Sequence, residues 1–166
     1  GVLGKNGSGI SVLIPSLKNL NLIIVSSLGK AFGINGGVIA GSKTFINIIK
    51  KDPLFIGSAG MSPAFLETFV NAQSIYENQL RKLHENCHYV FDKIHHLKEV
   101  RVSKNYPVFF FENDGIADYL HTQNILITSF YYPASTKKIN RIVLNANHTK
   151  KQLDILTDCL IQFKIS

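Results

Sequence analysis

The sequence lacks several features that would assign it to a specialised class of protein. Its 166 residues include no tryptophan and only two cysteines, and no apolar run approaches the ~20 residues of a membrane span. Cys87 and Cys159 lie far apart and form no framework of disulfide bridges, which is typical of a reducing cytoplasm. The sequence opens without a methionine and without a basic region before an apolar one, so we expect no cleavable signal. We therefore expect a cytoplasmic protein of which this chain is a part.

Acidic residues are also scarce. The chain has 18 lysines and arginines against 11 acidic residues, a net charge of +7, and its first acidic residue is Asp52. Such a charge could indicate nucleic acid, a membrane surface or a small anionic ligand. However, the lysines before Asp52 are scattered, apart from Lys50-Lys51, and no dense basic stretch is interleaved with aromatic residues. We expect no nucleic acid and no membrane partner, and favour an anionic pocket or acidic residues in a preceding segment.

Hydrophobic residues make up 45% of the chain, enough for a core, and their pattern changes along it. In residues 1–60, short β-branched runs at 22–25 and 36–41 alternate with glycine-rich turns and predict two strands. A helix is predicted over 42–51, with a serine as its N-cap. Because neither strand contains a charge, we expect both to be covered on two faces, as in an α/β sheet.

From residue 62 the apolar residues recur with the period of a helix. Ser62-Pro63 is typical of an N-cap followed by proline at the first helical position. The pattern predicts one helix of about 35 residues over 61–97, too long for a small domain and suited to linking two domains.

The last part of the chain alternates strand and helix patterns. Strands are predicted at 100–103, 107–112, 125–130 and 139–144, and helices near 115–123 and 149–163. This order indicates a small α+β domain.

The sharpest candidate for chemistry is Lys30, in Ser26-Ser27-Leu28-Gly29-Lys30-Ala31-Phe32-Gly33. A lysine in a tight turn at the end of a strand suits a Schiff-base lysine. Ser27 offers a hydroxyl for a phosphate, and the glycines allow a close approach of the backbone to a ligand. From composition alone, a surface lysine in a glycine-rich hairpin is the simpler interpretation.

A metal site is less well supported. His84 and His88 are four residues apart with Cys87 between them, which is the spacing of a possible metal pair. No third ligand is evident, so we interpret the two histidines as part of an ordinary solvated helix face and expect no metal.

Several motifs together resemble one family. They are Gly1-Val2-Leu3-Gly4, Gly7 and Gly9, Ser27 to Gly33, Gly36-Gly37, Met61-Ser62-Pro63-Ala64, and Arg141 to His148. On these residues the chain resembles the C-terminal part of the α-oxoamine synthases, which are pyridoxal-phosphate (PLP) enzymes of aminotransferase fold type I. The resemblance implies an α/β fold with the end of the large-domain sheet in 1–60, a long interdomain helix in 61–97 and a small α+β C-terminal domain in 98–166.

The resemblance also implies roles for four residues. Lys30 matches the lysine that binds PLP covalently and later moves the Cα proton, and Ser27 matches the hydroxyl residue beside the cofactor phosphate. Arg141 matches the arginine that grips the amino-acid carboxylate, for which its planar fork is suited. Ser58 matches the turn that a neighbouring subunit offers to the phosphate, which implies a homodimer. Here Ser58-Ala59-Gly60 departs from the family, which has further hydroxyl residues in this turn.

The implied activity is that of an acyltransferase. With PLP as electron sink, such enzymes condense an amino acid with an acyl-CoA thioester with loss of CO₂. The family's aspartate facing the pyridine nitrogen and its histidine near the cofactor would precede Gly1, so this stretch by itself is expected to be inactive. Two alternatives remain open: a fold-type I aminotransferase, which would form a keto acid instead of releasing CoA, and a catalytically silent fragment or interaction module.

Overall fold

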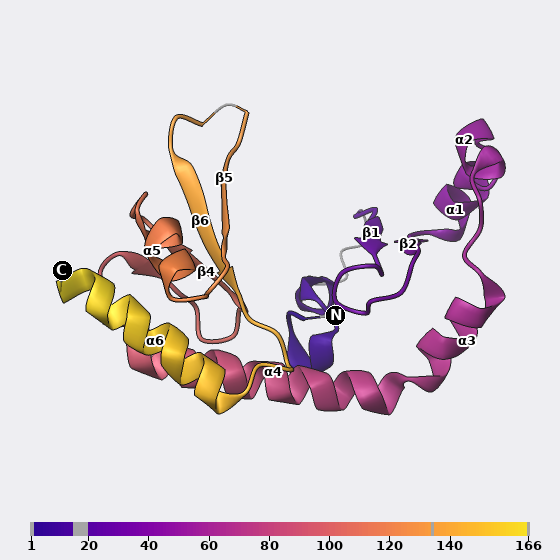
Figure 1. Ribbon diagram of the computed structural model, residues 1–166. Helices are drawn as coiled ribbons and strands as arrows, with labels where there is room; N and C mark the ends of the chain where they lie inside the picture. The colour runs from indigo at the N-terminus through magenta and orange to yellow at the C-terminus, as the bar shows by residue number, and fades with distance from the viewer. Residues whose placement is uncertain (1, 15–19, 134, 166) are drawn as a thin grey trace. The chain divides into compact units, whose positions relative to one another are not determined.

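The computed structural model describes residues 2–14, 20–133 and 135–165 (Figure 1). The chain divides into two compact units, Gly1–Glu77 (unit 1) and Asn78–Ser166 (unit 2), and each is described by itself. Gly1, with which the family resemblance begins, lies outside the described residues. The domain limits expected at residues 60 and 97 remain predictions.

A two-stranded antiparallel sheet forms the centre of unit 1. Strand β1 spans Ile24–Ser27 and β2 spans Gly37–Ala40, with Ser27 opposite Gly37. Two short 3₁₀ turns, η1 at Lys5–Gly7 and η2 at Ile10–Leu13, precede it. Both predicted strands are present, although β1 begins and ends two residues later than the predicted strand at 22–25. The expectation that two faces are covered is wrong for this chain. Every residue of the two strands is exposed, because the sheet described in this unit consists of these strands alone.

Two short helices follow β2 in unit 1, α1 at Lys43–Ile49 and α2 at Pro53–Gly57. The predicted cap of α1 is confirmed: Ser42 Oγ accepts a hydrogen bond from the backbone amide three residues later at 3.2 Å. Asp52 caps α2, with its Oδ1 accepting from the amide two residues later at 2.9 Å. Asp52, the residue after the predicted helix 42–51, therefore starts a second helix that was not predicted.

The single long helix predicted over 61–97 is wrong, because the structure has two helices there. Helix α3 spans Pro63–Asn71 and α4 spans Gln73–Ile94, and Ala72 between them has φ −92° and ψ 13°. The side-chain amide of Gln73 donates to the Phe69 carbonyl at 2.7 Å. In a continuous helix the backbone amide of the same glutamine would occupy that carbonyl. At the break, the Gln73 side chain thus takes the carbonyl that the helical backbone hydrogen bond would use.

Unit 2 combines a four-stranded antiparallel sheet, in the order β3-β4-β6-β5, with helices (Figure 1). The predicted order of strands and helices in 98–166 is confirmed. The elements are β3 Val100–Arg101, β4 Val108–Phe111, α5 Ile116–Thr122, β5 Thr128–Tyr131, β6 Lys138–Val143 and α6 Lys150–Ile165. Among the described residues, none of the helices combines the length and apolarity needed to cross a membrane.

One face of the four-stranded sheet carries the core of unit 2. In β4, Phe109 and Phe111 are 0% and 3% exposed, whereas Phe110 lies on the opposite face and is 38% exposed. Ile142 of β6 belongs to the buried face. Helices α4, α5 and α6 complete the core with Cys87, Val90, Ile94, Ile116, Leu120, Leu153, Leu156, Cys159 and Leu160.

A charged cluster joins α4 to α6 within unit 2. The Tyr89 hydroxyl and the Lys93 ammonium both donate to Oδ1 of Asp154, and the Lys150 ammonium lies 3.9 Å from the centre of the Tyr89 ring. The hydrogen bond from Lys93, with that from Tyr89, holds the pKa of Asp154 below its ordinary value. The same hydrogen bond raises the pKa of Lys93. Folding therefore favours the ionised form of both groups.

The substitution Asp154→Asn should destabilise the protein at neutral pH. Because the folded-state pKa of Asp154 is depressed, its contribution is present above the ordinary carboxyl pKa of ~3.9 and is lost as the pH falls through the lower folded value. The raised pKa of Lys93 means that its contribution is lost only in strongly alkaline solution. Urea titrations should therefore give the variant a lower midpoint than wild type at neutral pH, with the difference narrowing in strong acid.

The control for this prediction is Glu85→Gln, which removes an exposed ion pair between Arg81 and Glu85 on one helix. Such pairs contribute little, so this variant should unfold close to wild type. A difference between Asp154→Asn and wild type that persists undiminished in strong acid would contradict the assignment.

Candidate functional site

The turn between β1 and β2, residues 28–36, carries Lys30. The Leu28 amide donates to the Gly36 carbonyl at 2.9 Å, and the Ile34 amide donates to the Leu28 carbonyl at 3.1 Å. The side chains of Leu28 and Ile34 are buried, and they are the buried hydrophobic residues of the part of unit 1 that the structure describes. The turn is thus closed at its base, and the segment around Lys30 forms its tip.

Ser27 lies directly before this turn and Lys30 lies within it, and both have polar atoms that could bind a ligand. Lys30 is exposed, and its ammonium makes no hydrogen bond or ion pair with any described residue. Ser27 ends β1, and its Oγ accepts a hydrogen bond from the Gly29 amide at 3.3 Å. Because a hydroxyl can donate as well as accept, the hydrogen of Ser27 remains available to an acceptor. The structure therefore brings these two predicted residues together in one turn.

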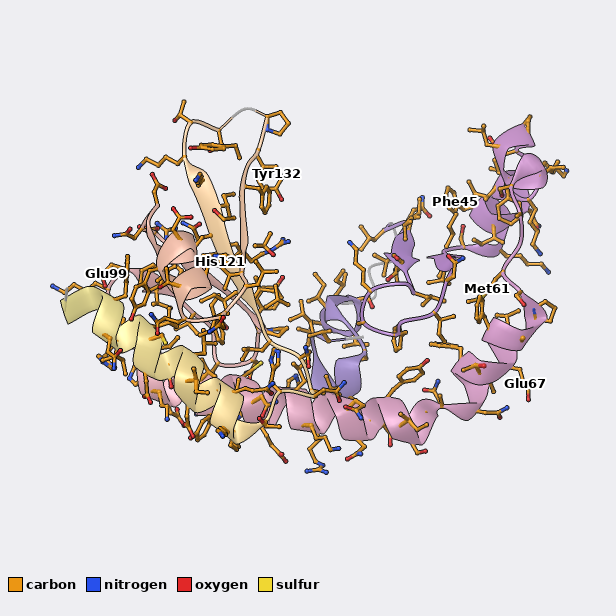
Figure 2. All side chains as sticks on the ribbon, viewed as in Figure 1. Phe45, Met61, Glu67, Glu99, His121 and Tyr132 are labelled. Atoms are coloured by element: carbon orange, nitrogen blue, oxygen red, sulfur yellow. The ribbon has the colours of Figure 1, made fainter. Side chains whose placement is uncertain are left out.

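Two glycines of the turn are required by its geometry. Gly33 has a φ of +64°, and Gly36 has a φ of +151°, values that residues with a side chain rarely adopt. A Cβ added at Gly36 would lie 2.8 Å from Cε of Met61, a residue of the segment before α3 (Figure 2). The sequence indicated that the glycines make room for a ligand. At Gly36 the neighbour is instead this methionine.

Sequence reasoning missed the aromatic residues that support the turn. Phe32 contacts both Phe69 of α3 and Tyr76 of α4, with ring centres 5.2 and 5.0 Å apart. The helical periodicity accounted for Phe69 and Tyr76 as members of an apolar stripe, and spacing cannot reveal a contact between residues 44 positions apart. The available signal was a phenylalanine two residues after Lys30, between Ala31 and Gly33.

Arg141 belongs to unit 2, on the face of the sheet opposite the core. It lies in β6, paired with Phe110 of β4 and Thr128 of β5. Its guanidinium carbon is 5.5 Å from the centre of the Phe130 ring, a cation–π contact. Its Nε is buried and has no hydrogen-bond partner among the described residues. Arg141 is thus a half-buried cation with an unsatisfied hydrogen-bond donor. These are properties that favour the binding of an anion.

Ser58 follows α2 in unit 1. It is exposed, and its hydroxyl donates to the Phe55 carbonyl at 2.8 Å. Lys30, Ser27 and Ser58 therefore belong to unit 1 and Arg141 belongs to unit 2. The roles of all four residues remain predictions.

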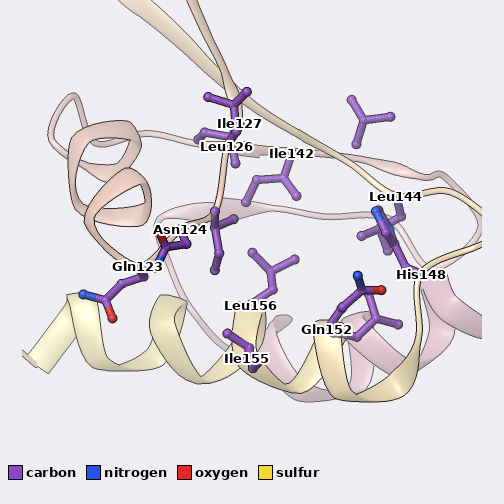
Figure 3. A pocket seen from close by; sticks show the side chains of 13 residues that line it. Gln123, Asn124, Leu126, Ile127, Ile142, Leu144, His148, Gln152, Ile155 and Leu156 are labelled. Carbon is purple, nitrogen blue, oxygen red and sulfur yellow. The ribbon is translucent and has the colours of Figure 1, made fainter.

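Unit 2 also contains a pocket of about 550 Å³ (Figure 3). Aliphatic side chains of residues 125–127, β6 and α6 line it, together with polar residues that include His148 and Gln152. Both ring nitrogens of His148 are engaged by Asn145. The lining includes no charged side chain, no hydroxyl and no thiol, and none of the four predicted site residues. This pocket is not the candidate catalytic site.

Cys87 and His88 of unit 2 are not placed as reactive groups. Burial raises the pKa of the Cys87 thiol to about 11, so it is protonated at neutral pH and a poor nucleophile. His88 Nε2 lies 2.9 Å from Oδ1 of Asn105. Within the described ranges, no three histidine, cysteine or acidic residues are grouped so that they could hold a metal ion.

The fold is similar to that of solved enzymes. A crystal structure of 8-amino-7-oxononanoate synthase from Francisella tularensis superposes on 99% of this chain and 53% of its own, with a TM-score of 0.73 and 28% identity. A variant of serine palmitoyltransferase from S. paucimobilis, solved with a bound PLP–myriocin aldimine, gives a TM-score of 0.68 over 87% of this chain and 41% of its own. At 14% identity the latter shows the fold alone. The chain has the mixed helix and sheet architecture of fold-type I transferases and covers part of it.

Sequence comparison identifies the family. A statistical model of the aminotransferase class I and II family matches residues 3–160, so the chain belongs to that family. A curated relative, 8-amino-7-oxononanoate synthase from Petrotoga mobilis, is 31% identical to this chain in an alignment 169 positions long. The alignment covers 93% of this chain and 42% of the relative. The chain thus spans less than half the length of this relative.

Proposed function

We propose that the chain is part of an 8-amino-7-oxononanoate synthase, a PLP-dependent acyltransferase of biotin biosynthesis. Such an enzyme condenses an amino acid with an acyl thioester with loss of CO₂. The observation that carries the proposal is the closed turn that presents Lys30 and Ser27 together. The shared name of relatives that are 31% and 28% identical supports the choice within the family.

The residues of the turn fit PLP. The cofactor's aldehyde requires a lysine amine, and Lys30 is exposed with no partner among the described residues. Its phosphate requires hydrogen-bond donors, and the Ser27 hydroxyl retains its hydrogen for such an acceptor. Lys30 would therefore hold the cofactor covalently at one end, and Ser27 would bind it at the phosphate end.

PLP, when bound, supplies an electron sink for the carbanion that develops at the substrate Cα. The residues of this chain supply binding and proton transfer. Lys30 Nζ, once it is free of the cofactor, moves the proton at the substrate Cα. Because Arg141 presents a planar guanidinium with a buried unpaired Nε, it binds the amino-acid carboxylate and orients the Cα.

A homodimer is part of the proposal. Leu54 and Ile56 of α2 are 85% and 69% exposed, immediately before Ser58. Large exposed apolar residues grouped together are typical of protein–protein contacts. We infer that this helix packs against a second copy of the chain, where the Ser58 turn would meet the partner's cofactor phosphate.

Covalent labelling tests the central assignment. In the protein expressed from its own gene, borohydride reduction in the presence of PLP should place the label on Lys30, and Lys30→Ala should abolish both label and activity. General acid–base catalysis alone contributes about 10²–10⁴-fold, so loss of at least that size is expected. Lys43→Ala, at an exposed lysine of α1, is the control and should retain both. A label mapped to a different lysine would refute the assignment.

The substitution Arg141→Lys should weaken amino-acid binding. Lysine keeps the charge but loses the bidentate fork, so the affinity for alanine should fall by about 1.5–3 kcal/mol, the value of a charged hydrogen bond. Cofactor loading should not change, because Lys30 and Ser27 bind that group. Titration with alanine, followed by the visible absorbance of the cofactor, measures both quantities.

A matched control for Arg141 is Arg101→Lys. Arg101 lies opposite Phe110 in the neighbouring strand and forms an exposed ion pair with Glu112. Since its charge is already paired, this variant should bind alanine as wild type does. Equal alanine affinities in the two variants would show that Arg141 does not bind the carboxylate.

The substitution Leu54→Glu should shift the protein from dimer to monomer, because it places a charge in the apolar surface of α2. Leu126→Glu is the matched control, since Leu126 is 87% exposed in unit 2. Sedimentation velocity should detect the change in mass for Leu54→Glu only. A wild-type protein that is active as a monomer would exclude the shared site.

A further inference from the structure

A cluster of three aromatic side chains, Phe32, Phe69 and Tyr76, holds the tip of the turn that carries Lys30. The rings of Phe69 and Tyr76 meet the Phe32 ring nearly edge to face, at interplanar angles of 87° and 80°. The Phe69 and Tyr76 rings also contact each other, with centres 6.0 Å apart. Edge-to-face pairs of this kind are favourable beyond the apolar area that they bury. All three rings are half-buried in a unit whose described residues are mostly exposed.

Tyr76 also fixes the backbone of the turn. Its hydroxyl donates a hydrogen bond to the Phe32 carbonyl at 3.4 Å. The tip of the turn lies beyond the β1–β2 ladder, which ends where Ser27 pairs with Gly37. The peptide groups of the tip, the Phe32 carbonyl among them, therefore lack a partner from a neighbouring strand. A side chain from α4 supplies a hydrogen bond at a position where the sheet supplies none.

The neighbouring residues make such support necessary. Lys30 is followed by Ala31, and glycines stand at 29 and 33. Of residues 29–33, only Phe32 has a large apolar side chain that can pack against another element. A lysine amine that must reach a fixed point on a ligand needs its backbone held to well under 1 Å, since small displacements cost large factors in rate. Phe32 is thus the point through which the helices can hold Lys30.

We propose that Tyr76 is a positioning residue for Lys30, acting through Phe32, with Phe69 supporting the same ring. The proposal rests on the proposed function, because it takes Lys30 as the lysine that binds the cofactor and moves the proton. Tyr76 itself touches neither cofactor nor substrate. Its loss lets the tip of the turn move, so that the amine of Lys30 reaches its productive position less often.

The test compares Tyr76→Leu, Tyr76→Phe and Ile75→Ala in the protein expressed from its own gene. Tyr76→Leu removes the aromatic contact and the hydroxyl, whereas Tyr76→Phe removes the hydroxyl alone. Ile75→Ala alters the adjacent residue of α4, which is 58% exposed, and is the matched control.

The first readout is amide hydrogen exchange of the unliganded protein, which requires no activity. In Tyr76→Leu, exchange of the Ile34 amide, which donates to the Leu28 carbonyl at 3.1 Å, should become roughly three- to tenfold faster, the value of one aromatic pair or one hydrogen bond, while exchange in β1 stays at the wild-type rate. Tyr76→Phe should show a smaller increase, and Ile75→Ala none.

The second readout concerns Lys30 directly. The rate at which added PLP becomes attached, and kcat, should fall by a similar factor in Tyr76→Leu and recover in part in Tyr76→Phe. KM for alanine should stay within about twofold of wild type, because Arg141 is untouched. The pH midpoint of the visible absorbance should also shift in Tyr76→Leu, an effect that general loss of stability would not produce.

The outcomes distinguish a failure of the positioning role of Tyr76 from a failure of the proposed function. If wild type carries the label on Lys30, but Tyr76→Leu matches Ile75→Ala in exchange at Ile34, attachment rate and pH midpoint, then the positioning role is overturned and the proposed function stands. If wild-type label maps to another lysine, the proposed function and the role of Tyr76 are overturned together.

Discussion

The proposed site depends first on the two backbone hydrogen bonds that meet at Leu28. One joins Leu28 to Gly36 and the other joins Ile34 to Leu28, at 2.9 and 3.1 Å. Each is worth only about 0.5–1.5 kcal/mol net, but both are protected by the buried side chains of Leu28 and Ile34. They continue the β1–β2 pairing past its last strand residue and fix the base of the turn. Without that base, the side chains of Ser27 and Lys30 would have no fixed orientation.

The two units achieve their order in different ways. Unit 2 has a core in which β4, β6 and three helices bury side chains such as Phe109 and Leu160 completely. In unit 1, Val25 is 73% exposed and the apolar strands have no cover among the described residues. Its order comes instead from caps, turn hydrogen bonds and the aromatic contacts of Phe32. A strand as apolar as β1 would be buried in a larger α/β sheet, which agrees with a chain that spans part of the fold-type I architecture.

The features that sequence could predict are those set by local pattern. Alternation and turn residues predicted the order of elements in 98–166, and Ser42 was recognisable as a cap because its chemistry acts within one helical turn. The break at Ala72 was not predictable from periodicity, because it involves a hydrogen bond between the Gln73 side chain and the Phe69 carbonyl. The contact of Tyr76 with Phe32 was equally inaccessible, since it joins distant segments. For the candidate site, sequence therefore proposed the polar residues but not their supports.

Arg141 shows how the same strand can serve the core and the proposed site. Because Ile142 must enter the core, strand alternation places Arg141 on the opposite face. There its guanidinium lies over the Phe130 ring, which attracts a cation but accepts no strong hydrogen bond from Nε. A buried donor without a partner costs about 1–3 kcal/mol. A carboxylate that accepts a hydrogen bond from Nε would remove that cost. The relief of this penalty would then contribute to the free energy of binding. Arginine suits this position better than lysine, because its planar guanidinium presents several donors in a fixed fork that matches a carboxylate.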